Sequence, residues 1–313
     1  MKQAFDVVGD VHGYAEPLEQ LLLAMGYEKK GKGFQHPDRT LIFIGDLVDR
    51  GPDQQRTVEI ARSMVDYGDA IVLMGNHEFN AICYAMPQAD SSFIRPHNDK
   101  NFLQHKDFLK AFPFGSNDYR DAIAFFKRLP LWLEDDEFRA IHACWHEPSL
   151  ATLRPVLDDQ YCIQDDSFYE RFSDSESDIY KAVEVILKGP EVSLPDGVSF
   201  KDSDGNERHE ARVHWWHLPH APEKAFLGVK SVDQLLDGAA TYIYDDQAKP
   251  VMFGHYSKVG ENVHEQSSSD CAFCLDWGVI RKRKQLCALR WNGNLKDSER
   301  FVIRNEWSVS RDV

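Results

Sequence analysis

Acidic, amide and imidazole side chains recur in this chain, each time directly after a short apolar run. The groups are Gly9-Asp10-Val11-His12-Gly13, Gly45-Asp46-Leu47-Val48-Asp49-Arg50-Gly51, Gly75-Asn76-His77-Glu78, His142 and Gly254-His255. These residue types bind divalent metal ions, and two such ions side by side can promote hydrolysis of a phosphate ester. The sequence therefore predicts a two-metal hydrolase of phosphate esters.

The elements that must position these groups are short buried strands. The apolar runs are rich in β-branched residues and end near Gly or turn residues; they span 5–8, 41–44, 70–74, 138–141 and 251–253. Apolar residues at helical spacing follow the first two groups, at 15–25 and 57–67. Strands that alternate with helices predict a layered α/β core.

The spacing of the polar residues suggests how they could share two ions. Side chains two apart in an extended chain point the same way, so Asp10 and His12 can hold one ion together. Asp46 has two carboxylate oxygens and can bridge that ion to a second. The remaining candidates supply one oxygen and two nitrogens: Asn76, His142 and His255. This mixed set favours Mn, Fe or Zn over Ca or Mg.

A simpler explanation exists for each acidic residue alone. An Asp after a strand is more often a helix cap or a turn former than a metal ligand. Capping, however, does not require His12, Asn76 with His77, or two further histidines at strand ends. The ordered set therefore favours metal binding.

The order GDVHG, GDLVDRGP, GNHE, H and GH resembles the calcineurin-like metallophosphoesterases, in the branch of phosphoprotein phosphatases and symmetrical diadenosine tetraphosphate hydrolases. The resemblance implies an α/β fold with a layered β-sandwich core flanked by helices. It also implies two divalent metal ions, Mn²⁺ first, with Fe or Zn as alternatives. The implied ligands are Asp10, His12 and Asp46 at one metal, and Asp46, Asn76, His142 and His255 at the other.

The resemblance further assigns catalytic roles. Arg50 would clamp the phosphoryl group, with Asn76 as a second substrate contact, while hydroxide between the metals attacks phosphorus. His77, held by Asp49, would protonate the leaving oxygen. Asp276, in a tail similar to that of the tetraphosphate hydrolases, would orient a ligand histidine. The bland alternatives are a local Asp49–Arg50 salt bridge and a buried His77 without a catalytic role.

Composition limits the partners. The chain has 313 residues, of which 42% are hydrophobic, so it can bury a full core. A net charge of −15 argues against a nucleic-acid partner. The lack of a long apolar stretch argues against a membrane, and the sparse cysteines favour a reducing, cytoplasmic location. The expected partner is a phosphorylated substrate: a phosphoprotein, a small phosphoester or a nucleotide.

We expect a single domain, 1–313, with two insertions. Residues 81–133 predict a helical lobe, and 150–238 predict a cap-like segment. The stretches 272–275, 285–291 and 301–305 predict a closing antiparallel set of strands. Cys271 and Cys274 are interpreted as structural.

Four other features have two interpretations each. Trp215 and Trp216 could stack a nucleobase or fill the core, and the core is favoured. Arg212 could reach the phosphate, but a surface position is favoured. His146 with Glu147 could line the mouth of the site or form a loop salt bridge. The basic run 281–284 is favoured as a solvated hairpin tip over a phosphate-binding loop.

Three functions follow from the sequence. The leading hypothesis is hydrolysis of phosphate monoesters, as in protein phosphatases. The alternative is hydrolysis of dinucleoside polyphosphates, for which we expect Trp215 and Trp216 to face the metals. A remote hypothesis is a metal-binding scaffold without turnover.

Overall fold

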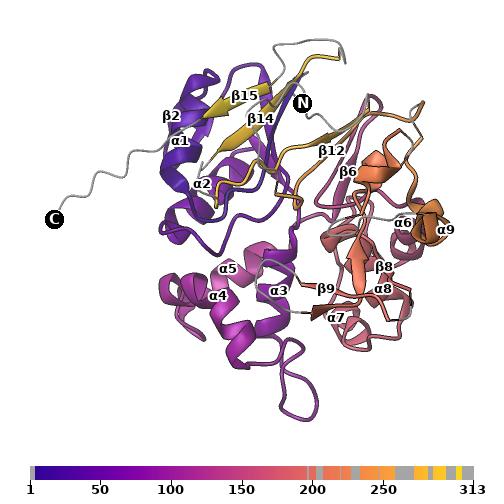
Figure 1. Cartoon of the computed structure of the whole chain (residues 1–313). Coiled ribbons are helices and arrows are strands. Elements are labelled where there is room, and N and C mark those ends of the chain that lie inside the picture. Colours follow the sequence, from indigo (N-terminus) through magenta and orange to yellow (C-terminus); the bar gives the residue numbers. More distant parts are fainter. Residues whose placement is uncertain are drawn as a thin grey trace.

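Two β-sheets packed face to face form the centre of the computed structural model (Figure 1). The structure describes residues 4–195, 197–201, 207–218, 220–226, 233–245, 247–257, 271–280, 285–293 and 301–304. The first sheet has the order β15-β14-β1-β4-β5, and the second has the order β13-β12-β7-β6. The strands of the first are β1 (Ala4–Val8), β4 (Arg39–Phe43), β5 (Ala70–Val72), β14 (Leu286–Trp291) and β15 (Phe301–Arg304). Those of the second are β6 (Trp132–Glu134), β7 (Arg139–Ile141), β12 (Val251–Phe253) and β13 (Ala272–Cys274).

Each sheet contains three neighbouring parallel strands, and this decides where the polar groups lie. In the first sheet β1, β4 and β5 run parallel, with Val8 opposite Phe43 and Phe43 opposite Val72. In the second sheet β7, β12 and β13 run parallel. Five of these six strands are followed by one of the polar groups, which therefore emerge at carboxyl ends of parallel strands.

The core between the sheets follows from the two-residue period of strands. Val7 and Ile42 belong to the cluster between the sheets, where they are joined by Phe138, Met252 and Phe273 of the other sheet. Their chain neighbours, such as Val8, belong instead to the larger cluster beneath the helices. Both faces of the sheet are thus buried, which explains why its strands are nearly continuous apolar runs.

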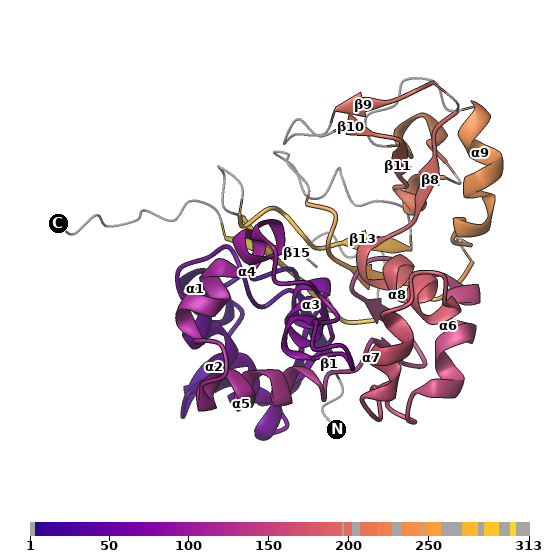
Figure 2. The same ribbon diagram turned by 90° about the horizontal axis from the view of Figure 1, so that it is seen from below.

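Helices of the first half of the chain cover the first sheet and build a lobe below it (Figures 1 and 2). α1 (Ala15–Ala24) packs against β14 and β15, and α2 (Gln54–Asp66) packs against β5. The small hairpin of β2 (Glu28–Lys30) and β3 (Gly33–Gln35) packs against α2. The lobe consists of α3 (Asn76–Ala85), α4 (Asp99–Ala111) and α5 (Asn117–Phe126).

The second half of the chain adds helices and small sheets on the other side, as Figure 2 shows from below. Its helices are α6 (Glu147–Leu153), α7 (Ser167–Phe172), α8 (Asp178–Lys188) and α9 (Asp233–Ala239). Four 3-10 turns accompany them: Arg154–Val156, Trp215–His217, Pro222–Lys224 and Ala240–Tyr242. Two short antiparallel pairs form the cap: β8 (Glu191–Ser193) with β11 (Glu210–Arg212), and β9 (Phe200–Lys201) with β10 (Glu207–Arg208).

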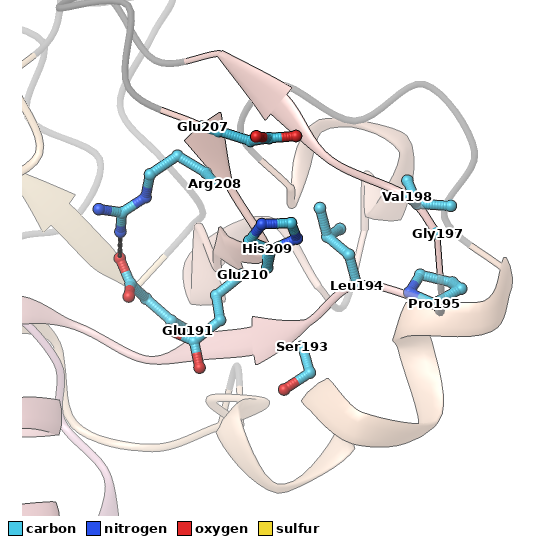
Figure 3. A pocket seen from close by; sticks show the side chains of 10 residues that line it. All are labelled: Glu191, Ser193, Leu194, Pro195, Gly197, Val198, Glu207, Arg208, His209 and Glu210. Carbon is cyan, nitrogen blue, oxygen red and sulfur yellow. Dashed lines mark hydrogen bonds and ion pairs between the residues drawn. The ribbon is translucent and has the colours of Figure 1, made fainter.

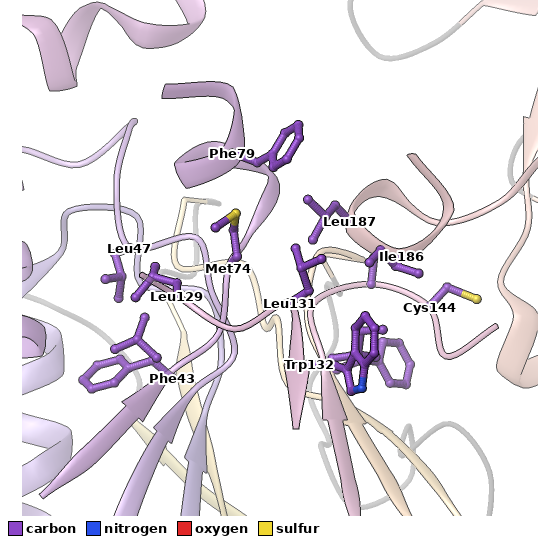
Figure 4. Close-up of a cluster of buried hydrophobic side chains, with 14 of the residues drawn as sticks. Phe43, Leu47, Met74, Phe79, Leu129, Leu131, Trp132, Cys144, Ile186 and Leu187 are labelled. Carbon is purple, nitrogen blue, oxygen red and sulfur yellow. The ribbon is translucent and has the colours of Figure 1, made fainter. Parts of the chain in front are cut away.

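An apolar cluster with members from both halves of the chain joins the two halves (Figure 4). Met74 and Phe79 come from the first half, whereas Ile186 and Leu187 come from α8, and all four are buried. The backbone N–H of Ala143 also donates to the carbonyl of Ile186, at 3.0 Å. α8 is therefore fixed to the strand that ends just before His142.

One strand differs from the sequence prediction. The stretch 272–275 was expected in a closing antiparallel set, but β13 pairs parallel to β12, with Val251 opposite Ala272. β14 and β15 do close the first sheet in antiparallel fashion. The error arises because alternation fixes which face of a strand is buried and leaves its neighbour undetermined. The turn-rich run 203–206 and the basic run 281–284 lie outside the described residues.

Across the part of the chain that the structure describes, no helix has the length and apolar character needed to cross a membrane.

Candidate metal centre and substrate cleft

The Asp46 carboxylate lies at the centre of the converging side chains. His142 Nε2 is 3.4 Å from Asp46 Oδ1, and His12 Nε2 is 3.6 Å from Asp46 Oδ2. Asn76 Oδ1 lies 3.1 Å from His142 Nε2 and 2.9 Å from His255 Nδ1. Four of these five side chains are buried, and His255 is half-buried. Residues from four separate strand ends and a helix start therefore meet at one place.

Asp10 completes the group but has an unsatisfied oxygen. Its Oδ2 accepts the backbone N–H of His255 at 3.0 Å, whereas its buried Oδ1 has no hydrogen-bond partner among the described residues. Burial and the charge of Asp276 raise the pKa of Asp10 well above its usual value. A Cβ at Gly254 would lie 2.0 Å from Asp10 Oδ1, so only glycine fits there. A bound cation would satisfy this oxygen and offset the cost of burying it.

Two sets of donors share Asp46, and each could hold one metal ion. One set is His12, Asp46 and His77, and the other is Asp46, His142 and His255. Within each set the donor atoms all lie within 4.8 Å of one another. Burial opposes the charged form of His142, yet the Asp46 carboxylate raises the pKa of His142 to about 10. The pocket thus attracts positive charge, and its oxygen and nitrogen donors suit two divalent ions.

The backbone is strained where these side chains are presented. Outside glycine, positive φ angles occur at His12 (48°), Asp46 (52°), Asp49 (67°), Arg50 (76°) and His255 (66°), and at only two other described residues. The left-handed conformation costs roughly 1–3 kcal/mol per residue and clusters at functional sites. The surrounding core and loops must therefore hold these turns in place.

Glu78 is one of the groups that hold these strained turns in place. Its carboxylate is fully buried and accepts the backbone N–H groups of Asp46 (2.8 Å), Leu47 (2.8 Å) and Gly75 (3.0 Å). Burial raises the pKa of Glu78 to about 7. Glu78 caps α3 and ties the Asp46 loop to it. Glu78 is not among the site residues predicted from the sequence, although its position three residues after Gly75 is typical of a capping residue.

The Asp49 carboxylate is shared by two histidines. His77 Nδ1 lies 2.6 Å from Asp49 Oδ2, and His105 Nδ1 lies 3.0 Å from Asp49 Oδ1. Burial opposes ionisation of Asp49, but hydrogen bonds from His105 and His77 hold its pKa well below the usual value. Burial likewise opposes the charge on His77, whereas Asp46 and Asp49 raise the pKa of His77. His77 can therefore carry a proton beside Asp46, and the Asp49 carboxylate orients its ring.

His105 is not among the site residues predicted from the sequence, because a single histidine in a helix carries no local signal. It lies on α4, 56 residues after Asp49, and is buried against Phe108.

A cleft of about 870 Å³ opens beside the candidate metal ligands. Asn76, His77 and His255 border it, as do Arg50 and Arg212. Arg50 is exposed and forms no ion pair with any described residue, so the local salt bridge with Asp49 does not form. Arg212 Nη1 lies 3.4 Å from His255 Nε2, although the sequence favoured a surface position. Two guanidinium groups therefore border the cleft, and that of Arg212 also forms an ion pair with Glu191 at 3.3 Å.

Trp215 and Trp216 are core residues and do not line the cleft. Both are buried and pack on Phe253, and Trp215 Nε1 donates to the carbonyl of Ala143 at 3.0 Å. They therefore cannot stack a nucleobase at the metal ligands, as the dinucleotide hypothesis expected.

Two further predicted features lie close by. Asp276 is buried near Asp10, and its Oδ1 accepts the backbone N–H of Gly278 at 2.9 Å; its action on a ligand histidine stays a prediction. His146 Nδ1 lies 2.8 Å from Ser149 Oγ, and Glu147 pairs with Arg154. Neither His146 nor Glu147 borders the cleft.

A second pocket, of about 660 Å³, lies in the cap (Figure 3). Three glutamates, Glu191, Glu207 and Glu210, line it together with Arg208, which forms an ion pair with Glu191 at 3.0 Å. Its acidic lining does not suit a phosphorylated ligand. The cleft beside Asp46 is thus the better candidate for substrate binding.

The fold and the convergence at Asp46 agree with the comparison to protein families. Residues 4–255 match the model of the calcineurin-like phosphoesterase family, so the chain belongs to this family. The resemblance noted in the sequence and the expected layered fold are thereby confirmed.

Two similar proteins come from bacteria. The chain is 41% identical over 73 residues to bis(5'-nucleosyl)-tetraphosphatase PrpE [asymmetrical] of Oceanobacillus iheyensis, covering 23% of this chain and 29% of that protein. It is 43% identical over 74 residues to the protein of the same name from Halalkalibacterium halodurans, covering 23% and 30%. The match therefore spans less than a third of the length of these relatives.

A protein serine/threonine phosphatase from Saccharomyces cerevisiae aligns over 98% of this chain and 81% of its own, with 14% identity and a TM-score of 0.48. A likeness of this extent carries no argument about activity.

Proposed function

We propose that this chain is a two-metal phosphoesterase that hydrolyses dinucleoside polyphosphates. The observation that carries the proposal is the convergence of the donor groups on Asp46 beside a cleft rich in cations. Asp10, His12 and Asp46 would hold one ion. The second would be held by Asp46, Asn76, His142 and His255. Manganese is the expected metal, with iron or zinc as alternatives.

The chain's own groups would bind and orient the phosphate. Divalent ions held by these residues would supply positive charge for the phosphoryl oxygens and a water of lowered pKa. Arg50 and Arg212 border the cleft and would bind the equatorial oxygens, where negative charge accumulates in phosphoryl transfer. Asn76 lies between the ligand histidines and would offer its amide N–H groups to the same oxygens.

His77 would protonate the leaving oxygen. Its Nδ1 is 2.6 Å from Asp49, which fixes the ring so that Nε2 points toward Asp46, at 3.9 Å. A proton carried on Nε2 would thus face the reacting phosphate.

Dinucleoside polyphosphates are favoured over monoesters by the charge of the cleft. Seven cations line it: Arg50, Arg95, Lys100, Lys181, Lys188, Arg208 and Arg212. Among the described residues, four carboxylates do so: Asp49, Glu184, Glu191 and Glu210. This local excess occurs in a chain of net charge −15, so it suits a ligand with several phosphates. The names of the two bacterial relatives support the same choice.

Monoester hydrolysis of the protein-phosphatase type is the second candidate, because the same metal groups would serve it.

Tyr180 and Tyr242 also line the cleft and offer aromatic faces for the nucleobase of a dinucleotide, a role that the buried tryptophans cannot take.

A substrate panel tests the proposal. The manganese-loaded protein is given diadenosine tetraphosphate, a phosphoseryl peptide and p-nitrophenyl phosphate, and kcat/KM is compared. We expect the largest value for the tetraphosphate, and its products, ATP with AMP or two ADP, identify the bond cleaved. Preference for the peptide would favour the second candidate. Absence of all turnover in a protein with two bound metals would favour the scaffold.

A further inference from the structure

A guanidinium group without an acidic partner lies in the cleft on the side of the helical lobe. Arg95 Nη1 donates to Asn80 Oδ1 at 2.9 Å, and Nη2 donates to Gln104 Oε1 at 2.6 Å. Both acceptors are neutral amide oxygens. No carboxylate in the described part of the chain lies within ion-pair distance of Arg95, and Asp49 and Glu184 influence its pKa only through charge. Glu184, on α8, pairs with Lys188, and Asp49 accepts hydrogen bonds from His77 and His105.

This arrangement fixes the guanidinium while its charge stays uncompensated. Arginine has five N–H donors, of which two are used here, so three stay available for a ligand. Arg95 is half-buried, and this desolvation lowers its pKa. A partly buried arginine held by neutral acceptors is suited to bind an anion, since no described carboxylate lies within ion-pair distance of it.

The position of Arg95 relative to the metal ligands follows from α3. Asn80, which holds Arg95, is four residues after the candidate ligand Asn76 on the same helix. Residues four apart lie on one face, displaced along the axis by about one turn, or about 5.4 Å. Both asparagines border the same cleft, together with Arg95 and the neighbouring exposed Lys100. A ligand at the metals could therefore extend along α3 to Arg95.

We infer that the helical lobe carries a second phosphate subsite, centred on Arg95, for a phosphate group that follows the one at the metals. The inference rests on the proposed function, because it assumes that the scissile phosphate binds beside Asp46. The ligand recognised by this subsite would be a chain of linked phosphates, whether in a dinucleotide or in inorganic polyphosphate. Arg95 would then determine specificity between polyphosphates and simple monoesters.

A structural role is the competing explanation, because Arg95 also ties α3 to α4 through Asn80 and Gln104. Loss of such a tie would disturb the lobe and would affect all ligands alike. A subsite, in contrast, would affect only ligands long enough to reach it. The ratio of the affinities for a long and a short phosphate ligand therefore separates the two explanations.

The experiment compares orthophosphate with tripolyphosphate as inhibitors of p-nitrophenyl phosphate hydrolysis at fixed free Mn²⁺. Calorimetric Kd values for both anions give a second measurement that needs no turnover. The variants are Arg95→Met, which removes the charge, and Arg95→Lys, which keeps it but cannot keep both hydrogen bonds. Arg62→Met is the control, because Arg62 lies on α2 outside the cleft and its removal changes the net charge equally.

We expect tripolyphosphate to bind more tightly than orthophosphate to the unaltered protein. Arg95→Met should reduce that preference by about tenfold or more, as for loss of a charged hydrogen bond. Arg95→Lys should reduce it by less, and Arg62→Met should not change it. An unchanged preference in both Arg95 variants, or equal weakening of both anions, would overturn the subsite.

If Arg95→Met does not fold, as judged by its thermal unfolding, the result for Arg95→Lys decides. Failure of the proposed function is seen separately, as absent cleavage of diadenosine tetraphosphate, since neither inhibitor measurement uses that compound.

Discussion

At the scale of single residues, the site depends on groups that satisfy one another around Asp46. The Asp46 carboxylate lies between His12 and His142, and its backbone N–H is held by Glu78. Asp10 keeps one buried oxygen without a partner among the residues described, which a cation would occupy. Each neighbour has a separate task, so single substitutions can separate metal binding from proton transfer.

His77→Ala tests proton transfer. Loss of a general acid typically slows turnover by roughly 10² to 10⁴-fold. The metal content should stay near that of the unaltered protein, because His77 lies near Asp46 but is not among the proposed ligands of either ion. Turnover of p-nitrophenyl phosphate and elemental analysis of the metals measure the two quantities. Unchanged turnover would remove His77 from the mechanism.

His105 tests whether the helical lobe supports the Asp49–His77 pair. His105→Phe keeps the stacking with Phe108 but loses the hydrogen bond to Asp49, so we expect kcat to fall by about tenfold with little change in KM. His105→Asn can place a donor near the position of Nδ1 and should recover part of the loss. Equal kcat in His105→Phe and the unaltered protein would show that His77 is oriented without His105.

At the scale of elements, parallel strands and one helix start bring the ligands together. β1, β4, β7 and β12 each end shortly before a candidate ligand, and α3 begins at Asn76. Glu78, in the first turn of α3, links the loop after β4 to the helix through three backbone N–H groups. This connection explains how Asp46 can hold a left-handed backbone conformation.

Glu78→Leu tests that connection. Removing the carboxylate would leave buried N–H groups unsatisfied, each at a cost of about 1–3 kcal/mol. We therefore expect the free energy of unfolding to fall by at least about 2 kcal/mol, together with weaker metal binding. Denaturant unfolding of the metal-free protein measures the first effect. Glu176→Gln is a suitable control, because that side chain is 84% exposed and should change stability by less than about 0.5 kcal/mol. Equal unfolding midpoints for the two variants would contradict the anchoring role.

Local pattern predicted the elements that carry the ligands but not the contacts between distant ones. Alternation and strand-end glycines located β1, β4, β5, β7 and β12 to within a few residues. The pairing of β13 was wrong because apolar periodicity does not specify a neighbour. His105 and Arg95 reach the cleft through tertiary packing of the lobe, and no sequence spacing indicates that. Arg212 was assigned to the surface for the same reason.

At the scale of the whole molecule, two properties combine. The sandwich of two sheets directs the carboxyl ends of parallel strands from both sheets to the site, and residues of the helical lobe and of the cap line the cleft beside it. The chain is strongly acidic overall, yet cations outnumber carboxylates along the cleft. This local excess of cations in an acidic chain would attract the polyphosphate ligands that we propose. Binding of such ligands should weaken as the salt concentration rises, because salt screens the charge of the cations.

The central claim is that Asp46 joins two metal ions, and metal stoichiometry tests it most directly. The protein and its Asp46→Ala variant are saturated with Mn²⁺, freed of unbound metal by gel filtration and measured by elemental analysis. We predict about two ions per chain for the unaltered protein and close to none for the folded variant, because both donor sets lose their shared ligand. Two ions retained by Asp46→Ala, or none bound by the unaltered protein, would contradict the account.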